Sequence, residues 1–150
     1  MSSNQSITAV YGTQVTGTYT TYGAGCRGTG NMIPGHVGGG TPEVGRLMNW
    51  DVTHIPSTFG SLNFGARSAP VPLAFLGMGT CTLDVTIATT FSLAFNGAGL
   101  ARLQFTTPSD PSLIGARVAT QGSVFDPGTA TPTKVVQTAG LETRIGGFQQ

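Results

Sequence analysis

Apolar and polar residues alternate along many short segments of this chain, and this pattern constrains its fold more than any other feature. In one clear example, Cys81, Leu83 and Val85 alternate with threonine and aspartate. A strand with one buried and one wetted face has this period of two. No stretch of about ten residues, the length of an ordinary helix, keeps a 3.6-residue period without a glycine or a β-branched run. The chain is therefore predicted to be all-β, with almost no helix.

The alternating segments are short and closely spaced. About nine strands at spacings of roughly 8–12 residues are typical of a β-sandwich or barrel. Turn signals such as Asn96-Gly97 separate them. We predict a single antiparallel β-sandwich, Ig-like or jelly-roll-like, over residues 21–150, preceded by an N-terminal strand segment, residues 1–20. The expected strands are Ile7–Tyr19, Val44–Val52, Ser61–Gly65, Val71–Leu76, Cys81–Thr86, Phe91–Phe95, Ala101–Phe105, Val118–Phe125 and Leu141–Ile145.

The charge content narrows the range of partners. Only 9% of the 150 residues are charged, Lys134 is the single lysine, and the net charge is +1. Such a chain has no basic field to attract nucleic acid or an anionic membrane surface. No apolar run approaches the roughly 18 residues of a membrane span. We therefore expect neither nucleic-acid binding nor membrane insertion.

A glycine fingerprint near the N-terminus needs a separate explanation. The run Gly23-Ala-Gly-Cys-Arg-Gly28 matches the G-x-G-x-x-G pattern of dinucleotide-binding folds. That pattern works only where a helix follows and its N-terminus meets the pyrophosphate. Here Pro34, Pro42 and several glycines follow instead, and they forbid a helix. The match is expected to be fortuitous, and no cofactor is predicted.

The two cysteines, Cys26 and Cys81, lie in neither a C-x-x-C pair nor a Cys/His cluster, which argues against zinc. We predict that they form a disulfide, the alternative being two buried free thiols. The N-terminal sequence MSSNQSITAV lacks the basic start and apolar core of a signal peptide. The chain is therefore expected either to be cytoplasmic or to be the mature form of a secreted protein. A disulfide favours the second, with an extracellular or cell-surface location.

A family resemblance points the same way. The motifs that carry it are TYGAGCRGTG (21–30), PLAFLGMGTCTLDV (72–85), GLARLQFTTPSDPSLIGARVATQGSVFDPG (99–128) and TAGLETRIGG (138–147). Their spaced Gly, Cys, Pro-x-Asp-Pro and Gln positions resemble a small β-sandwich domain that recurs near the C-termini of secreted proteins in planctomycete-like and myxobacteria-like bacteria. The resemblance implies an extracellular all-β domain with no known active site, so no catalytic residue is carried over.

No residue pattern predicts an enzyme or a metal site. His36 and His54 are the only histidines; the carboxylates nearest to them in sequence are Glu43 and Asp51, and no metal-ligand motif joins them. We expect both histidines to be solvated, His36 in a glycine-rich loop and His54 at the end of the strand that contains Trp50. No serine lies in a G-x-S-x-G elbow. Three aspartates could serve as calcium ligands: Asp84, Asp110 and Asp126. However, Asp110 and Asp126 each precede a proline, and an ordinary turn explains both.

The functional expectation is self-association. Natural monomers protect sheet edges with charge, especially lysine, and this chain has almost none. We therefore predict a non-enzymatic, extracellular structural protein that assembles with itself, as a surface or fibre subunit. N-terminal strand addition to a neighbour is one route, with these residues as candidates: Ile7, Ala9, Tyr11, Val15 and Tyr19. The alternative is a carbohydrate-binding or adhesion module for polysaccharide, with Trp50 or Tyr22 exposed, although Trp50 also fits a core position beside Met48 and Val52.

Overall fold

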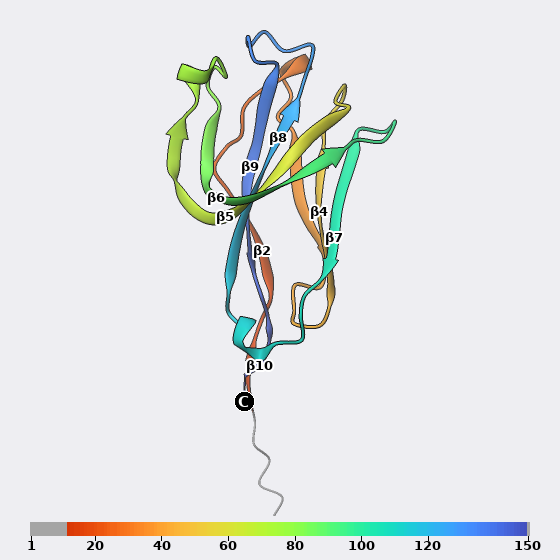
Figure 1. The fold of residues 1–150 in the computed structure, drawn as a ribbon, viewed down its shortest axis with the longest axis vertical. Helices are drawn as coiled ribbons and strands as arrows, with labels where there is room; N and C mark the ends of the chain where they lie inside the picture. Colours follow the sequence, from red (N-terminus) through yellow and green to blue (C-terminus); the bar gives the residue numbers. More distant parts are fainter. Residues whose placement is uncertain (1–11, 150) are drawn as a thin grey trace, which may run out of the picture.

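The computed structural model describes residues 12–149, and within them ten strands and three short 3-10 helices occur, with no α-helix. The strands are β1 (Thr13–Val15), β2 (Thr18–Tyr22), β3 (Gly35–Gly40), β4 (Leu47–Thr53), β5 (Phe59–Pro72), β6 (Thr82–Ala94), β7 (Leu100–Thr106), β8 (Arg117–Phe125), β9 (Val135–Arg144) and β10 (Gly147–Gln149). The 3-10 helices are η1 (Thr29–Asn31), η2 (Ala74–Leu76) and η3 (Pro111–Leu113). Figure 1 shows the strands running mostly along the long axis of the molecule.

The strands form three antiparallel sheets. A five-stranded sheet has the order β2-β9-β8-β5-β6, a three-stranded sheet the order β3-β4-β7, and β1 pairs with β10. The two larger sheets face each other, because Trp50 of β4 packs edge-on against Phe64 of β5 at a centroid distance of 5.0 Å. The prediction of an all-β antiparallel sandwich is confirmed.

The core follows the predicted alternation. Met48, Trp50 and Val52 of β4 are buried and face Leu62 and Phe64 of β5. Each of these residues is two positions from the next on its strand, so one face of each sheet fills the interior. Burial of these side chains supplies the main driving force of folding.

Several strand predictions were wrong. The segments Cys81–Thr86 and Phe91–Phe95, predicted as two strands, are parts of the single strand β6. The segment Val71–Leu76 was expected to be a separate strand, but β5 runs without a break to Pro72, and η2 follows it. The pairing of β5 with β6 is irregular between Arg67 and Val71, the stretch that separates the two predicted segments. The glycine-rich segment around His36, predicted to be a loop, is the strand β3, and its six residues pair fully with β4.

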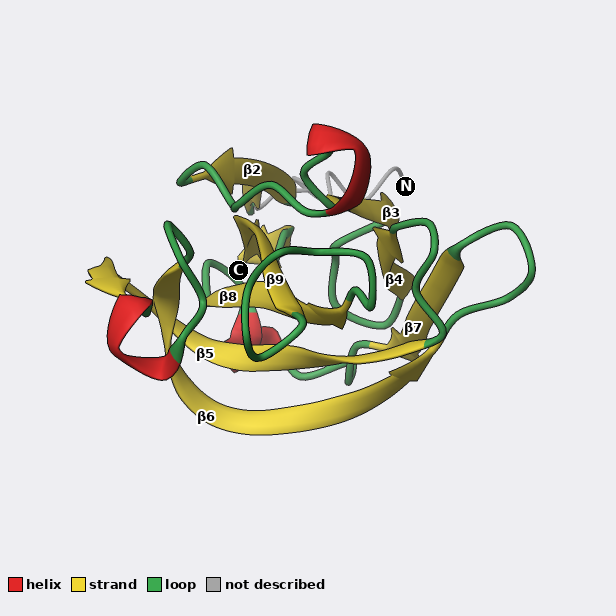
Figure 2. Ribbon diagram, turned by 90° about the horizontal axis from the view of Figure 1, so that it is seen from above, coloured by secondary structure: helices red, strands yellow, loops and turns green. Residues whose placement is uncertain are grey.

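The hairpin of β5 and β6 is long and strongly curved, and β6 forms an outer boundary of the molecule (Figure 2). Near its start, β6 is hydrogen-bonded by the buried side chain of Gln121 on β8. The Gln121 side chain accepts from Asp84 N at 2.9 Å and donates to the carbonyls of Thr82 at 3.0 Å and Thr138 at 2.9 Å. One amide thus ties β8 to β6 and β9.

Candidate functional site

The predicted disulfide is present. Cys26, in the loop after β2, is bonded to Cys81, directly before β6, with the two Cα atoms 4.8 Å apart. Both residues are buried. The bond links the connection between β5 and β6 to the loop that follows β2.

The two aromatic residues named as candidate ligand contacts are both buried, so neither has the exposure that this role needs, and Trp50 occupies the core position given as its alternative. Trp50 is 1% exposed, and its Nε1 donates to Thr143 Oγ1 at 3.1 Å across the interior. The Tyr22 hydroxyl donates to the carbonyl of Asp84 at 2.9 Å, and the Arg67 guanidinium lies 4.3 Å from its ring centroid. Burial, reinforced by the nearby Asp84, raises the pKa of Tyr22 to about 12. Neither ring offers a free face to a sugar.

The strand-exchange candidates fall into two groups. Val15 lies in β1, opposite Gly147, and Tyr19 lies in β2, opposite Thr143, so both belong to sheets of their own chain. The Tyr19 hydroxyl also donates to the carbonyl of Gly39 on β3 at 2.6 Å. The remaining candidates, Ile7, Ala9 and Tyr11, lie outside the described residues.

The expectation of solvated histidines was wrong, because both are buried. His36 points from β3 into the sandwich, where its Nε2 lies 2.8 Å from Thr120 Oγ1 and its Nδ1 lies 3.2 Å from the carbonyl oxygen of Asp51. Burial lowers the pKa of His36 to about 4, even though the carbonyl and charge of Asp51 favour the proton. His36 is therefore a neutral core residue at physiological pH.

His54 and Asp126 form a second buried polar cluster. His54 Nε2 lies 2.7 Å from Asp126 Oδ2, and the carboxylate also accepts from Thr29 N at 2.7 Å, from the Thr29 hydroxyl and from Gly128 N at 3.1 Å. Burial alone would raise the pKa of Asp126, but these donors lower it to about 2. In a nucleophilic triad, the histidine lies between the hydroxyl and the carboxylate. Here the Thr29 hydroxyl contacts the carboxylate directly and not the imidazole, so the three residues do not form a triad. The cluster joins three loops.

Metal binding finds no support in the part of the chain that the structure describes. Among residues 12–149, no three His, Cys, Asp or Glu side chains converge in a way that could hold an ion. Asp84 is buried, with Thr82 Oγ1 3.0 Å from its Oδ1. Asp110 is exposed and caps η3 by accepting from Ser112 N at 2.9 Å.

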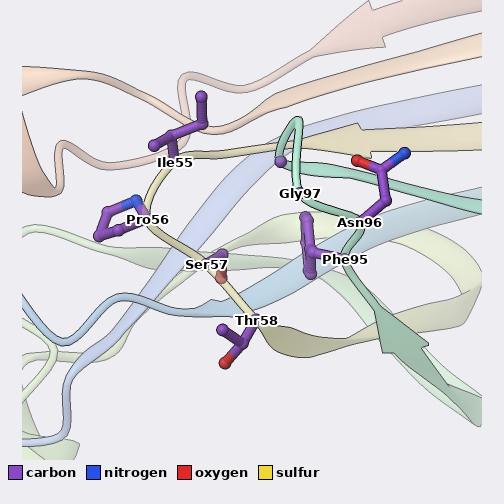
Figure 3. A pocket seen from close by; sticks show the side chains of 8 residues that line it. Ile55, Pro56, Ser57, Thr58, Phe95, Asn96 and Gly97 are labelled. Carbon is purple, nitrogen blue, oxygen red and sulfur yellow. The ribbon is translucent and has the colours of Figure 1, made fainter.

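A groove of about 300 Å³ lies between the loop that joins β4 to β5 and the loop that joins β6 to β7. In Figure 3, Ile55 and Pro56 lie on one side of it, Phe95 and Asn96 on the other, and Thr58 below. Ile55 is 63% exposed and also borders a second groove, of about 280 Å³, beside Met32 and Ile33. The residues that line the first groove carry no charge, so it suits a neutral ligand.

The most unusual surface is the outer edge of β6. Within residues 12–149, β6 pairs with β5 on one side and with no strand on the other. Every residue from Thr86 to Ser92 is exposed, and no charged residue occurs from Val85 to Ala101. We call the segment Thr86–Ala94, exposed except for the buried Leu93, the β6 edge. The sequence signal that could have indicated this edge is a long run without charged residues around a predicted strand.

The other sheet edges differ from the β6 edge. At the far side of the five-stranded sheet, β2 is five residues long, whereas β6 has thirteen. In the three-stranded sheet, β3 has four glycines among its six residues. On the opposite edge of that sheet, β7 carries Arg102, whose Nη2 lies 2.7 Å from Asp51 Oδ2. The β6 edge is therefore the longest of these edges, and it carries no charge along its exposed part.

Aromatic side chains gather where β6 and β7 lie near each other. The ring centroids of Phe91 on β6 and Phe105 on β7 are 6.2 Å apart, and Phe64 lies 5.3 Å from Phe91. Phe91 is 38% exposed and Phe105 37%. The interior of the sandwich thus reaches the surface along this side, next to the β6 edge.

In the described part of the chain, no helix has the length and apolar character needed to cross a membrane. Comparison of the chain with family models, curated proteins and solved structures finds no match.

Proposed function

We propose that this chain is a non-enzymatic, extracellular structural protein that self-associates as a subunit of a surface layer or fibre. The observation that carries the proposal is the β6 edge: a long, exposed and uncharged strand edge beside partly exposed phenylalanines. Unpaired N–H and C=O groups on such an edge are a template for another strand. A monomer that had to stay monomeric would be expected to place lysine there.

The disulfide supports the extracellular part of the proposal. Disulfides persist in oxidising compartments and are rare where thioredoxin and glutathione keep thiols reduced. The Cys26–Cys81 bond is buried, which shields it from thiol exchange. A structural disulfide of this kind suits a protein that works outside the cytosol.

The experiment is sedimentation velocity across a wide concentration range, with negative-stain microscopy of the concentrated sample. We expect reversible association of the full chain. A variant lacking residues 1–11 separates the N-terminal route from the others, and it stops there because β1 and β2 are parts of the chain's own sheets. A full chain that stays monomeric at every concentration would refute the proposal.

The groove between the β4–β5 and β6–β7 loops favours a second candidate, a non-catalytic carbohydrate-binding or adhesion module. Its apolar walls, Ile55 and Phe95, flank polar groups of Thr58 and Asn96, a combination that neutral sugars bind. Binding to neutral oligosaccharides that is lost in Ile55→Gln would support this candidate. Because Ile55 is largely exposed, the substitution leaves the core intact.

A further inference from the structure

We propose that the regular part of the β6 edge, Thr89–Ala94, pairs antiparallel with the same segment of a second copy around a two-fold axis at Ser92, so that Ser92 lies opposite its own copy. This inference rests on the proposed function, and it specifies the partner, the strand and the symmetry. The five-stranded sheets of the two subunits become one continuous sheet. The product is a closed dimer, so a fibre needs a second contact in addition.

The register within the hairpin sets the limits of the pairing. Thr89 to Ala94 lie opposite Phe64 to Phe59 without interruption, and the register shifts at the next position, where Gly65 lies opposite Ile87. Ala88 is the extra residue of this bulge, and a bulge bends a strand and disturbs its ladder. Six regular residues span about 20 Å, an ordinary strand length.

The charge pattern favours a second β6 as the occupant. In a two-fold antiparallel pair, each residue near the axis lies close to its own copy, so a charged residue there would face a like charge. The nearest charges along the chain, Asp84 and Arg102, both lie outside Thr89–Ala94. Of the sheet edges in residues 12–149, the β6 edge alone combines this neutrality with enough length and exposure.

The aromatic residues supply the apolar contribution. Phe91 is next to Ser92, so the two-fold axis places it diagonally across the new strand pair from its counterpart, within reach of an aromatic side chain. Cross-strand aromatic pairs stabilise antiparallel sheets. Phe91 and the adjacent Phe105 each have more than a third of their surface exposed in the single chain, and pairing covers part of it.

The first test is Ser92→Lys, with Thr20→Lys as its matched control. Ser92 and Thr20 are exposed residues on the two opposite edge strands of the same sheet, and each variant changes the net charge by the same amount. Ser92→Lys puts two like charges near the axis. We expect the dissociation constant of the dimer to rise about tenfold or more, about 1.4 kcal/mol, and that of Thr20→Lys to stay as in the wild type.

The second test is Ser92→Cys, with Thr20→Cys as control, after mild oxidation and nonreducing electrophoresis. We expect a covalent dimer from Ser92→Cys alone, because paired strands bring the two Cα atoms within disulfide range. This test stands even where Ser92→Lys fails to fold.

The outcomes separate the inference from the proposed function. A monomeric wild type overturns both. If the wild type associates, but Ser92→Lys leaves the dissociation constant unchanged and Ser92→Cys gives no covalent dimer, the β6 pairing is overturned and self-association stands. Association that depends on both residues 1–11 and Ser92 shows that the N-terminal segment occupies the β6 edge, which also overturns the two-fold pairing.

Discussion

At the scale of single residues, His36 shows how a neutral interior controls a titratable group. Its ring is buried between the two sheets, with a hydroxyl at one nitrogen and a backbone carbonyl at the other. No carboxylate side chain is among these hydrogen-bond partners. Desolvation therefore dominates, and it disfavours the charged form.

This placement predicts a loss of stability in mild acid. Unfolded His36 takes up a proton near pH 6.5, but folded His36 does so only near pH 4. Between these values the unfolded state binds more protons, so the free energy of unfolding falls as the pH falls from 6.5 to 4. The full loss from this group is about 3 kcal/mol. Urea unfolding at several pH values measures it.

The control is His36→Gln, whose amide keeps a donor and an acceptor but does not titrate. Its stability is expected to lie below that of the wild type at pH 7 and to fall less between pH 6.5 and 4. Equal pH slopes for the two proteins would contradict the assignment to His36.

Asp110 and Asp126 show where residue-level inference from sequence ends. Both precede proline, and both were assigned to turns. Asp110 does cap the adjacent turn, two residues away. Asp126 instead is fully buried, because His54 and Thr29, 72 and 97 residues away in the chain, converge on it. Local context gives no sign of such partners, which depend on tertiary structure.

At the scale of elements, alternation predicted the strands that have one buried face. The segments around Trp50, Leu103 and Val124 were all found as strands. Alternation failed for β3, whose glycines carry no apolar pattern, and for the continuity of β5, whose pairing with β6 is irregular between Arg67 and Val71. The β6 edge was overlooked because an edge is defined by the strand order, which a single sequence does not give.

The two sides of the sandwich differ, and this difference explains Gly38 in β3. On the β2–β3 side, the ring of Tyr19 lies against Gly38, and its hydroxyl reaches Gly39. Tyr19 thereby bridges the two sheets and closes that side. On the β6–β7 side, the phenylalanines leave part of the interior exposed.

Gly38→Ala tests the close contact. A Cβ at Gly38 would lie 2.1 Å from Tyr19 Cδ1, so the ring has to move. We expect a loss of about 1–3 kcal/mol in the free energy of unfolding, the range for overpacking. Gly97→Ala is the matched control, because a Cβ there meets no atom within 4 Å. Equal stability of the two variants in urea unfolding would show that Tyr19 tolerates the added methyl group.

At the scale of the whole molecule, one covalent bond links parts of the chain that are far apart in sequence. Cys26 and Cys81 are 55 residues apart, and the enclosed segment includes β3, β4 and β5. Cys26 also bonds with Gln137 through its backbone, at 3.0 Å. The bond therefore connects the loop after β2, which is hydrogen-bonded to β9, to the start of β6 within the five-stranded sheet.

Replacing both cysteines by alanine is expected to lower the free energy of unfolding by about 4 kcal/mol, the chain-entropy value for a loop of this length. Both side chains are buried, so alanine adds no polar group to the core. Urea unfolding of the variant against the oxidised wild type gives the difference, and the reduced wild type checks that the bond, rather than the lost sulfur atoms, is responsible.

The variant also bears on assembly, because Cys81 directly precedes β6. A folded variant whose dimer affinity equals that of the wild type shows that the β6 edge keeps its shape without the bond.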